Sequence, residues 1–188
     1  MAAVSSFMVP LDTPAPAFAL PALDGQLVSP ADFAGRPLLV MFLSNHCPYV
    51  RHIERELGVL IAGYGDQRLA AVAISSNNID SHPDDGPTGL AEQVRRAGFT
   101  FPYLLDSSQE VAKAYRAACT PDLFLYDAEH RLAYRGEFDD SRPRNDLSVT
   151  GQALRAAVDQ VLAGKPVPEP HVPSIGCSIK WKPGNEPN

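Results

Sequence analysis

The stretch LVMFLSNHCPYV, residues 39–50, contains the most informative change of pattern in the chain. An apolar run ends at Leu43, three polar residues follow, and Cys47 stands directly before Pro48, where a helical pattern begins. The stretch therefore predicts a strand that passes into a helix, with a thiol at the junction. A helix N-terminus carries partial positive charge and free backbone N–H groups, which favour the thiolate, the reactive form of cysteine. We interpret Cys47 as a nucleophile; the alternative is a small, inert core residue.

The residues around this stretch predict a β-α-β unit. Residues 38–43 form a nearly continuous apolar run, as expected of a strand that is buried on both faces. Pro48 suits the first position of a helix, where its missing N–H has no cost. The helix then shows an apolar stripe at Val50, Ile53, Leu57, Leu60 and Ile61. A second apolar strand at 69–75 should lie parallel to the first, with a right-handed crossover. The polar loop at 76–89 is long and is a candidate rim of a site.

Shorter elements fill the rest of the domain. Asp24-Gly25, between the short apolar stretches 17–20 and 26–28, predicts a β-hairpin. Apolar spacing predicts helices over 89–97, 107–116 and 154–162, and strands over 101–105, 123–126 and 131–135. The last two strands should form an antiparallel pair, so that the fold class is α/β with a mixed sheet.

The chain of 188 residues has the length of one domain with a sizeable core. We expect that domain to span residues 1–163, with 1–16 as an extended, Pro- and Ala-rich N-terminal arm. Residues 164–188 form a Pro-rich tail that is packed on the domain or tethered to it. The prolines at 166, 168, 170, 173, 183 and 187 should exclude a regular element from this tail.

Composition sets limits on partners and location. A net charge of −6 gives no basic patch for nucleic acid or an anionic membrane, and no apolar run has the length of a membrane span. The first ten residues lack the basic and apolar regions of a signal peptide, so we expect a cytoplasmic protein. Three cysteines without metal-ligand spacing predict neither a disulfide scaffold nor a metal site.

Four stretches together carry a resemblance to a known family. They are residues 15–21 with Asp24-Gly25, residues 44–50, residues 101–106 and residues 119–125. Over about residues 14–163 the chain resembles thioredoxin-fold redoxins, the relatives of alkyl hydroperoxide reductase and the thiol-specific antioxidant proteins. Its tail, at 176–181, resembles that of a peroxiredoxin-like subgroup. The resemblance implies a thioredoxin-like fold, with a mixed central sheet flanked by helices, and a cis Thr120-Pro121 bond facing the nucleophile.

The chain departs from the motifs of its relatives at three positions. Thioredoxins carry C-x-x-C, but here the second position is Val50, so dithiol exchange within the motif is impossible. Ser44 fits the hydroxyl of the peroxiredoxin motif P-x-x-x-T/S-x-x-C, but position 40 is Val instead of Pro. Thioredoxins also place a carboxylate where this chain has Met41. Proton transfer at Cys47 therefore relies on His46 or on water, or the site has no group that performs it.

Two further thiols could resolve an intermediate on Cys47. The resemblance places Cys119 beside the cis-proline loop, while Cys177 lies on a tail long enough to reach the site. Arg142, in a loop expected to return near the cis-proline, could stabilise a thiolate or a peroxide oxygen. The remaining candidate substrate-binding residues are Ser44, Asn45, Pro48, Thr120 and Pro121.

These features predict a thiol-dependent oxidoreductase that attacks a disulfide or a peroxide through Cys47. An external dithiol would supply electrons, and no cofactor is implied. One alternative is a thiol peroxidase, which Ser44 favours and Val40 opposes. The other is a non-catalytic redox sensor or binding module that holds a peptide beside the cis-proline.

Overall fold

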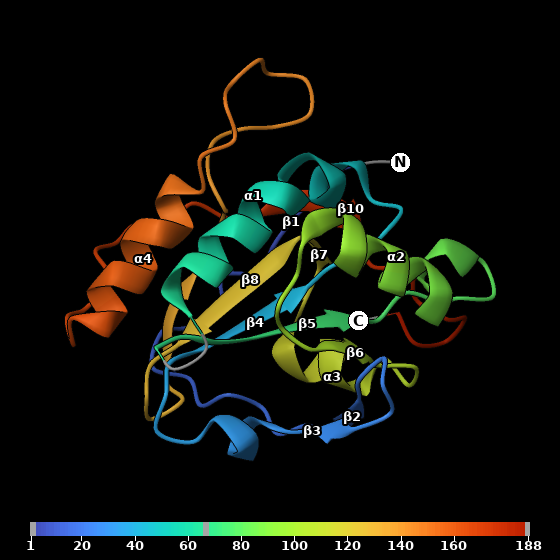
Figure 1. Cartoon of the computed structure of the whole chain (residues 1–188), viewed down its shortest axis with the longest axis horizontal. Coiled ribbons are helices and arrows are strands. Elements are labelled where there is room, and N and C mark those ends of the chain that lie inside the picture. Colours follow the sequence, from blue (N-terminus) through green and yellow to red (C-terminus); the bar gives the residue numbers. More distant parts are fainter. Residues whose placement is uncertain (1–2, 66–67, 187–188) are drawn as a thin grey trace.

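The computed structural model describes residues 3–65 and 68–186. Positions 1–2 of the predicted arm and 187–188 of the predicted tail lie outside these ranges. A five-stranded mixed sheet with the order β6-β5-β4-β8-β9 forms the centre (Figure 1). Its strands are β4 (Leu38–Phe42), β5 (Ala70–Ser75), β6 (Tyr103–Leu105), β8 (Asp122–Tyr126) and β9 (Leu132–Arg135). The first three run parallel, while β8 and β9 are antiparallel to their neighbours, which confirms the predicted fold class.

Helices cover both faces of this sheet (Figure 1). They are α1 (Pro48–Tyr64), α2 (Pro87–Ala97), α3 (Glu110–Tyr115) and α4 (Gln152–Leu162), with 3-10 turns at Pro30–Phe33 and Pro83–Asp85. One core lies between the sheet and α1, α2 and α4, and the other lies between the sheet and α3. Alternate residues of β4 serve the two cores, because side chains alternate across a strand: Met41 faces the first and Phe42 the second.

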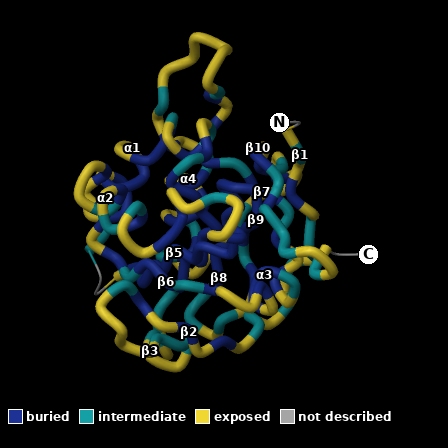
Figure 2. The backbone as a smooth tube through the Cα atoms, turned by 90° about the vertical axis from the view of Figure 1, so that its right-hand side faces the viewer, coloured by how far each residue is buried: buried dark blue, intermediate teal, exposed yellow. Residues whose placement is uncertain are grey.

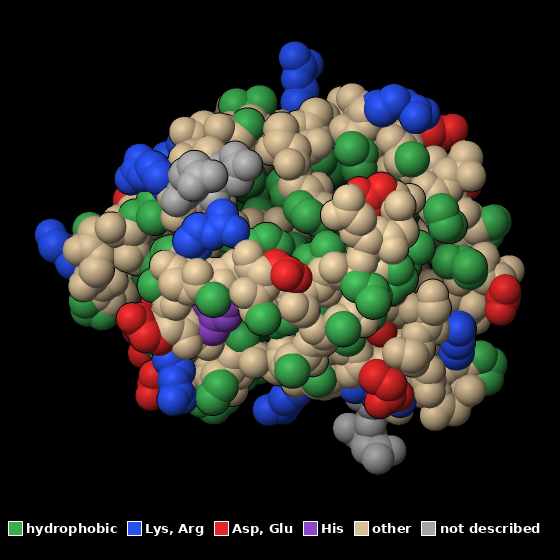
Figure 3. Space-filling model, turned by 60° about the horizontal axis from the view of Figure 1, so that its bottom comes forward, with side chains coloured by type: hydrophobic (Ala, Val, Ile, Leu, Met, Phe, Trp, Pro, Cys, Tyr) green, Lys and Arg blue, Asp and Glu red, His purple; other side chains and the backbone are tan. Residues whose placement is uncertain are grey.

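The second core is closed by the predicted hairpin. Strands β2 (Leu20–Pro21) and β3 (Leu27–Val28) pair antiparallel on either side of Asp24-Gly25. Gly25 has a φ of 85°, a conformation that glycine adopts without strain. The outer surface on this side carries charges of both signs, interspersed with apolar and neutral polar side chains (Figure 3).

Helix α1 follows the sequence pattern closely. Cys47 occupies the N-cap position and Pro48 begins the helix. The predicted apolar stripe is buried against the sheet, and Glu54 and Gly58 are buried with it. The helix therefore holds Cys47 at the C-terminal side of β4, where the main chain turns out of the sheet.

The C-terminal tail corrects one prediction. Ile175–Ser178 forms β10, which lies between β1 (Ala3–Ser5) and β7 (Cys119–Thr120) in an antiparallel three-stranded sheet. The prediction that prolines exclude a regular element is wrong for these four residues, because the prolines flank the strand and none lies within it. Ile179 is buried in the second core and Trp181 packs against it, so that the strand is anchored.

The dark blue segments in Figure 2 show that the strands of the central sheet are the most buried part of the chain. By contrast, the loop between β9 and α4 projects from the body and is largely exposed (Figures 1 and 2). The other boundaries differ slightly from those predicted: α2 begins two residues earlier, and α3 is limited to Glu110–Tyr115. None of the helices in the described ranges is long and apolar enough to cross a membrane.

Candidate active site

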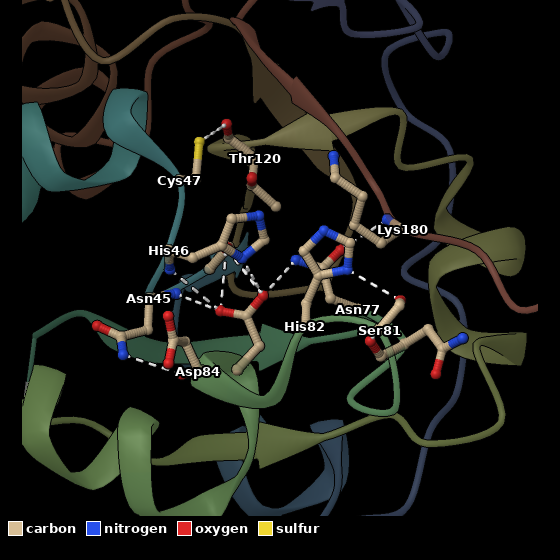
Figure 4. Close-up of polar contacts among 12 residues, drawn as sticks. Asn45, His46, Cys47, Asn77, Ser81, His82, Asp84, Thr120 and Lys180 are labelled. Atoms are coloured by element: carbon tan, nitrogen blue, oxygen red, sulfur yellow. Dashed lines mark hydrogen bonds and ion pairs between the residues drawn. The ribbon is translucent and has the colours of Figure 1, made fainter. Parts of the chain in front are cut away.

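Cys47 is enclosed at the start of α1. The residue has no exposed surface and packs within the first core, an environment that matches the alternative stated for it above. Its Sγ donates a hydrogen bond to the carbonyl oxygen of Thr120 at 3.1 Å, a contact that requires a sulfur-bound proton (Figure 4). The peptide bond between Thr120 and Pro121 is cis, as the resemblance implied. The cis-proline loop thus touches the thiol through the residue that precedes the proline.

Cys177 lies beside Cys47. In the pairing of β10 with β7, Cys177 is the Cα partner of Thr120, whose carbonyl receives the Cys47 thiol. Burial raises the pKa of the Cys177 thiol to about 12, and a side-chain interaction with Cys47 adds to the shift. The positive charge of Lys180 opposes this rise in the pKa of Cys177. The two thiols are free in this structure.

Cys119 occupies the other face of the same small sheet. It pairs with Ser178, one residue along from the Cys177–Thr120 pair, and side chains of successive strand residues point to opposite faces. Its Sγ contacts the carbonyl oxygen of Pro121 at 3.5 Å. Burial, with the nearby Asp122 carboxyl, raises the pKa of the Cys119 thiol well above its ordinary value. Cys47 and Cys177 contribute further to this rise in pKa, so that Cys119 is near both thiols. Of the two candidate resolving thiols, only Cys177 shares a side-chain interaction with Cys47 in the described residues.

Asp85 organises the polar residues that precede Cys47. Its carboxylate is fully buried and accepts hydrogen bonds from the Ser44 hydroxyl at 3.0 Å, from the Asn45 main chain at 2.6 Å and from His46 Nδ1 at 2.6 Å. Asn77 Nδ2 adds another at 2.7 Å (Figure 4). Burial alone would raise the pKa of Asp85, but the hydrogen bonds from His46 and Asn77 outweigh it and hold the pKa below its ordinary value. Asp85 is therefore a buried carboxylate.

Ser44 and Asn45 hold this loop in place. The Ser44 hydroxyl contacts Asp85 and His46 Nδ1, so that it is already engaged within the polar cluster. The Asn45 side chain donates to the carbonyl of Asp84 at 2.9 Å and accepts from Arg96 at 2.8 Å. These contacts fix the loop against the 3-10 turn Pro83–Asp85 and against α2.

His46 lies between Asp85 and the cis-proline loop. Its ring stacks on that of His82, with centroids 4.6 Å apart, and its Nε2 is buried without a hydrogen-bond partner. The hydroxyl of Thr120 is likewise buried and unpartnered. Burial, His46 and Lys180 together lower the pKa of His82. In Figure 4 the imidazole of His46 turns one edge to the carboxylate and the other toward Thr120.

The tail is tied to the same polar cluster. The Asn77 side chain donates to Asp85 and accepts from the main-chain N–H of Lys180 at 2.7 Å. The N–H of Asn78 donates to the carbonyl of Lys180 at 2.8 Å. The predicted rim loop at 76–89 thus contacts both the residues before Cys47 and the residues after Cys177.

Arg142 and Pro48 lie outside this cluster. The Arg142 guanidinium pairs with Glu137 and donates to the main-chain carbonyls of Asp139 at 2.6 Å and Ser141 at 2.7 Å. It lines a small hollow together with Tyr49, His52 and Pro121. Pro48 is exposed next to the nucleophile. Arg142 therefore lies near the cis-proline, as predicted, but its donors are engaged by its own loop.

Sequence reasoning missed Asp85, His82 and Asp122. The first two lie in the long polar loop that was predicted to border a site, but nothing in the sequence indicated which of its residues turn inward. Asp122 follows the cis-proline and is fully buried. Its Oδ2 accepts from the N–H of Ala118 at 3.0 Å and its Oδ1 has no partner. Burial raises the pKa of Asp122 to about 7. Within residues 3–65 and 68–186, no three His, Cys, Asp or Glu side chains gather in a way that could hold a metal ion.

A comparison with protein families matches residues 11–135 to the AhpC/TSA family. This match covers well over half of the chain. The chain belongs to the AhpC/TSA family. Membership makes it a thiol-dependent redox protein with a thioredoxin-like fold, in agreement with the resemblance found in the sequence.

Solved structures of similar proteins extend this likeness over the whole chain. An uncharacterised conserved protein from Geobacillus kaustophilus is 48% identical, with a TM-score of 0.94 and 98% of each chain covered. A hypothetical protein from Sinorhizobium meliloti is 50% identical, with a TM-score of 0.93, covering 96% of this chain and 99% of its own. A putative thiol:disulfide interchange protein from Chlorobium tepidum shares the fold at 19% identity, with a TM-score of 0.63 over 81% and 98% of the two chains. None of the curated proteins matches the sequence significantly.

Proposed function

We propose that this member of the AhpC/TSA family is a thiol–disulfide oxidoreductase in which Cys47 and Cys177 form a reversible disulfide. The observation that carries the proposal is the position of Cys177, which interacts with Cys47 from the strand that pairs with Thr120. Both cysteines are buried in the first core. The Cys47 thiol contacts the main chain of the residue opposite Cys177, and this geometry supports a bond between the two sulfurs.

The reaction has two steps. The Cys47 thiolate attacks one sulfur of a substrate disulfide, so that the substrate S–S bond breaks and a mixed disulfide forms on Cys47. Cys177 then attacks the Cys47 sulfur and releases the second substrate thiol. The substrate disulfide gains two electrons, and the Cys47–Cys177 pair is oxidised to a disulfide. An external dithiol returns the pair to its reduced state.

Access to Cys47 requires movement of the tail. Cys47 has no exposed surface, and β10 packs between β7 and β1 next to it. In the described part of the chain, two residue pairs join β10 to β7 and a hydrogen bond from the N–H of Ile179 to the carbonyl of Ala118 continues this edge, so that the edge is a short one. We infer that β10 separates from β7 when a substrate disulfide reaches the sulfur, and that it returns when Cys177 resolves the intermediate.

The site offers less support for a peroxidase. In that alternative the Ser44 hydroxyl would assist the peroxide, but it is engaged by Asp85 and His46. Stopped-flow oxidation of Cys47 by hydrogen peroxide separates the two functions, because a peroxidase reacts rapidly and a disulfide oxidoreductase slowly. The sensor or binding-module alternative predicts that Cys47→Ser retains partner binding and cellular function.

The proposal extends to partners and location. The substrate is a protein disulfide, the electron donor is a dithiol of the cell, and the compartment is the cytoplasm. No contact with nucleic acid or membrane forms part of the mechanism.

Disulfide mapping tests the proposed pair. The reduced protein is treated with one equivalent of diamide, blocked with N-ethylmaleimide and analysed by peptide mass spectrometry. We expect a 47–177 link in the wild type and in Cys119→Ala, and no intramolecular link in Cys177→Ala. A 47–119 link in the wild type, or no link at all, would contradict the proposal.

A further inference from the structure

Two buried polar atoms near Cys47 lack partners. They are Nε2 of His46, from the loop after β4, and the hydroxyl oxygen of Thr120, from β7. Buried polar groups are nearly always hydrogen-bonded, so that two orphaned atoms next to one thiol require an explanation. In the view of Figure 4 the Thr120 side chain lies between the imidazole of His46 and the sulfur of Cys47.

The buried carboxylate fixes the chemical state of the imidazole. Asp85 accepts a hydrogen bond from His46 Nδ1 at 2.6 Å, and an ionised carboxylate can only accept. Nδ1 therefore carries a proton, so that in the neutral ring Nε2 presents its lone pair. The stacked ring of His82 and the hydrogen bonds from Ser44 and Asn77 to the carboxylate keep this arrangement rigid.

We propose that His46 transfers the proton of the Cys47 thiol through the Thr120 hydroxyl, with Asp85 as the positioning residue. This inference rests on the proposed function and adds the proton path that its first step needs. The Cys47 thiol already donates to the carbonyl of Thr120, and the proposed path requires it to turn from that oxygen to the hydroxyl of the same residue.

The step balances within the site. The Cys47 proton passes to the Thr120 hydroxyl, which gives its own proton to His46 Nε2, and Asp85 faces the resulting imidazolium. The thiolate attacks a disulfide, the substrate S–S bond breaks, and the departing sulfur takes the proton back from Nε2. His46 ends neutral, and the two electrons pass only between sulfurs.

Three charged or titratable groups surround the imidazole. The Asp85 carboxylate from the 3-10 turn contacts Nδ1, the His82 ring stacks on the imidazole, and Lys180 from the tail lowers the pKa of His82. Without His46 the reaction depends on direct ionisation of the thiol, whose thiolate fraction rises about tenfold per pH unit below the thiol pKa. With His46 as the base, the rate should depend less steeply on pH.

The test measures the first step alone. In the Cys177→Ala background, 2-hydroxyethyl disulfide is added between pH 6 and 9, and mixed-disulfide formation on Cys47 is followed by mass spectrometry. This disulfide has a poorly acidic leaving thiol, so that the returned proton matters. We expect His46→Gln to slow the reaction at pH 7 by at least about 30-fold and to give a rate that rises about tenfold per pH unit. Asp85→Asn should slow it at least about tenfold, because an amide can hold the ring in the wrong tautomer.

Two substitutions of Thr120 serve as a test variant and its matched control. Thr120→Val removes only the hydroxyl and should slow the step at least about tenfold, while Thr120→Ser should restore most of the loss. Cooperative urea unfolding of each variant shows that it is folded. Equal rates and equal pH slopes with and without His46, or equal rates in the two Thr120 variants, would overturn the proposal, as would the absence of any reaction at Cys47. The 47–177 map decides the proposed function separately, because this readout does not involve Cys177.

Discussion

Cys177 and Thr120 are opposed residues in the pairing of β10 with β7, and the Thr120 carbonyl receives the Cys47 thiol. Thr120 therefore pairs with the strand that carries Cys177 and accepts a hydrogen bond from the side chain of Cys47. In the proposed function, Cys177 from the C-terminal tail takes the place of the second cysteine of a C-x-x-C motif, which the chain lacks at Val50. The proposal therefore predicts that the reactivity of Cys47 depends on how firmly β10 is held.

Gly176 of β10 packs against the main chain of Thr120, so that a larger residue at this position should loosen the strand. A Cβ added to Gly176 would lie 2.0 Å from the carbonyl oxygen of Thr120 and 2.6 Å from its carbonyl carbon. Because these are main-chain atoms of a buried strand, Gly176→Ala should separate β10 from β7 and lower the free energy of unfolding by about 1–3 kcal/mol. Alkylation of Cys47 by iodoacetamide should become at least about tenfold faster.

Gly63→Ala is the matched control for this substitution. Gly63 lies in α1, where an added Cβ meets no atom within 4 Å. The control should leave the alkylation rate unchanged and stabilise the helix by about 0.5–1 kcal/mol. If the Gly176 variant keeps both the wild-type stability and the wild-type alkylation rate, β10 does not cover the thiol as described.

Asp122 predicts an unusual dependence of stability on pH. Burial raises its pKa to about 7 from an ordinary value of 3.8, so that between about pH 4 and 7 the folded state retains a proton that the unfolded state has released. The contribution of this group to stability is therefore full below about pH 4 and is lost as pH rises to about 7, by up to about 4 kcal/mol. Asp122→Asn cannot ionise and should lack this loss.

Urea unfolding at pH 5, 6, 7 and 8 checks this expectation. The free energy of unfolding of the wild type minus that of Asp122→Asn should fall by about 1.4 kcal/mol per pH unit up to about pH 7, and then level off. A difference that stays constant across the range would mean that Asp122 is already ionised at pH 5.

How far the sequence determines this site differs from element to element. β4 and α1 could be predicted because a buried strand and an amphipathic helix leave local patterns of apolar residues, and Pro48 marks the boundary between them. The cis Thr120-Pro121 bond followed only from the family resemblance. The strand at Ile175–Ser178 could not be predicted, because its pairing partners lie more than 50 residues away and its flanking prolines indicate irregular structure.

The buried position of Asp85 likewise could not be predicted from the sequence. It lies 39 residues after His46 in the chain, within a loop that also contains the exposed Asp84. Only the folded chain decides which of the two neighbouring carboxylates turns inward. The long polar loop did indicate the rim of a site, because loops after parallel strands gather at one edge of the sheet.

Arg142 predicts an effect on stability without an effect on the thiol. Its guanidinium is committed to Glu137 and to two carbonyls of its own loop. Arg142→Ala should leave Glu137 partly buried without its partner and lower the free energy of unfolding by about 1–3 kcal/mol. The rate of 47–177 disulfide formation should stay within twofold of the wild type. Arg144→Ala, at an exposed position of the same loop, should change neither quantity. A slower disulfide reaction in Arg142→Ala alone would show that this arginine takes part in the reaction of the thiols.

Asn77 predicts how the polar cluster holds the tail. Its side chain joins the Asp85 carboxylate to the N–H of Lys180, three residues after Cys177. Asn77→Ala removes that acceptor, so that the Lys180 amide should exchange with deuterium about fivefold faster, since a hydrogen bond contributes about 1 kcal/mol. Asn78→Ala is the matched control, because Asn78 contacts Lys180 through its main-chain N–H, which the substitution retains. Equal exchange in the two variants would show that the tail is held by β10 and its apolar anchors alone. Faster exchange in Asn77→Ala alone would show that Asn77 links the Asp85 carboxylate to the segment that follows β10.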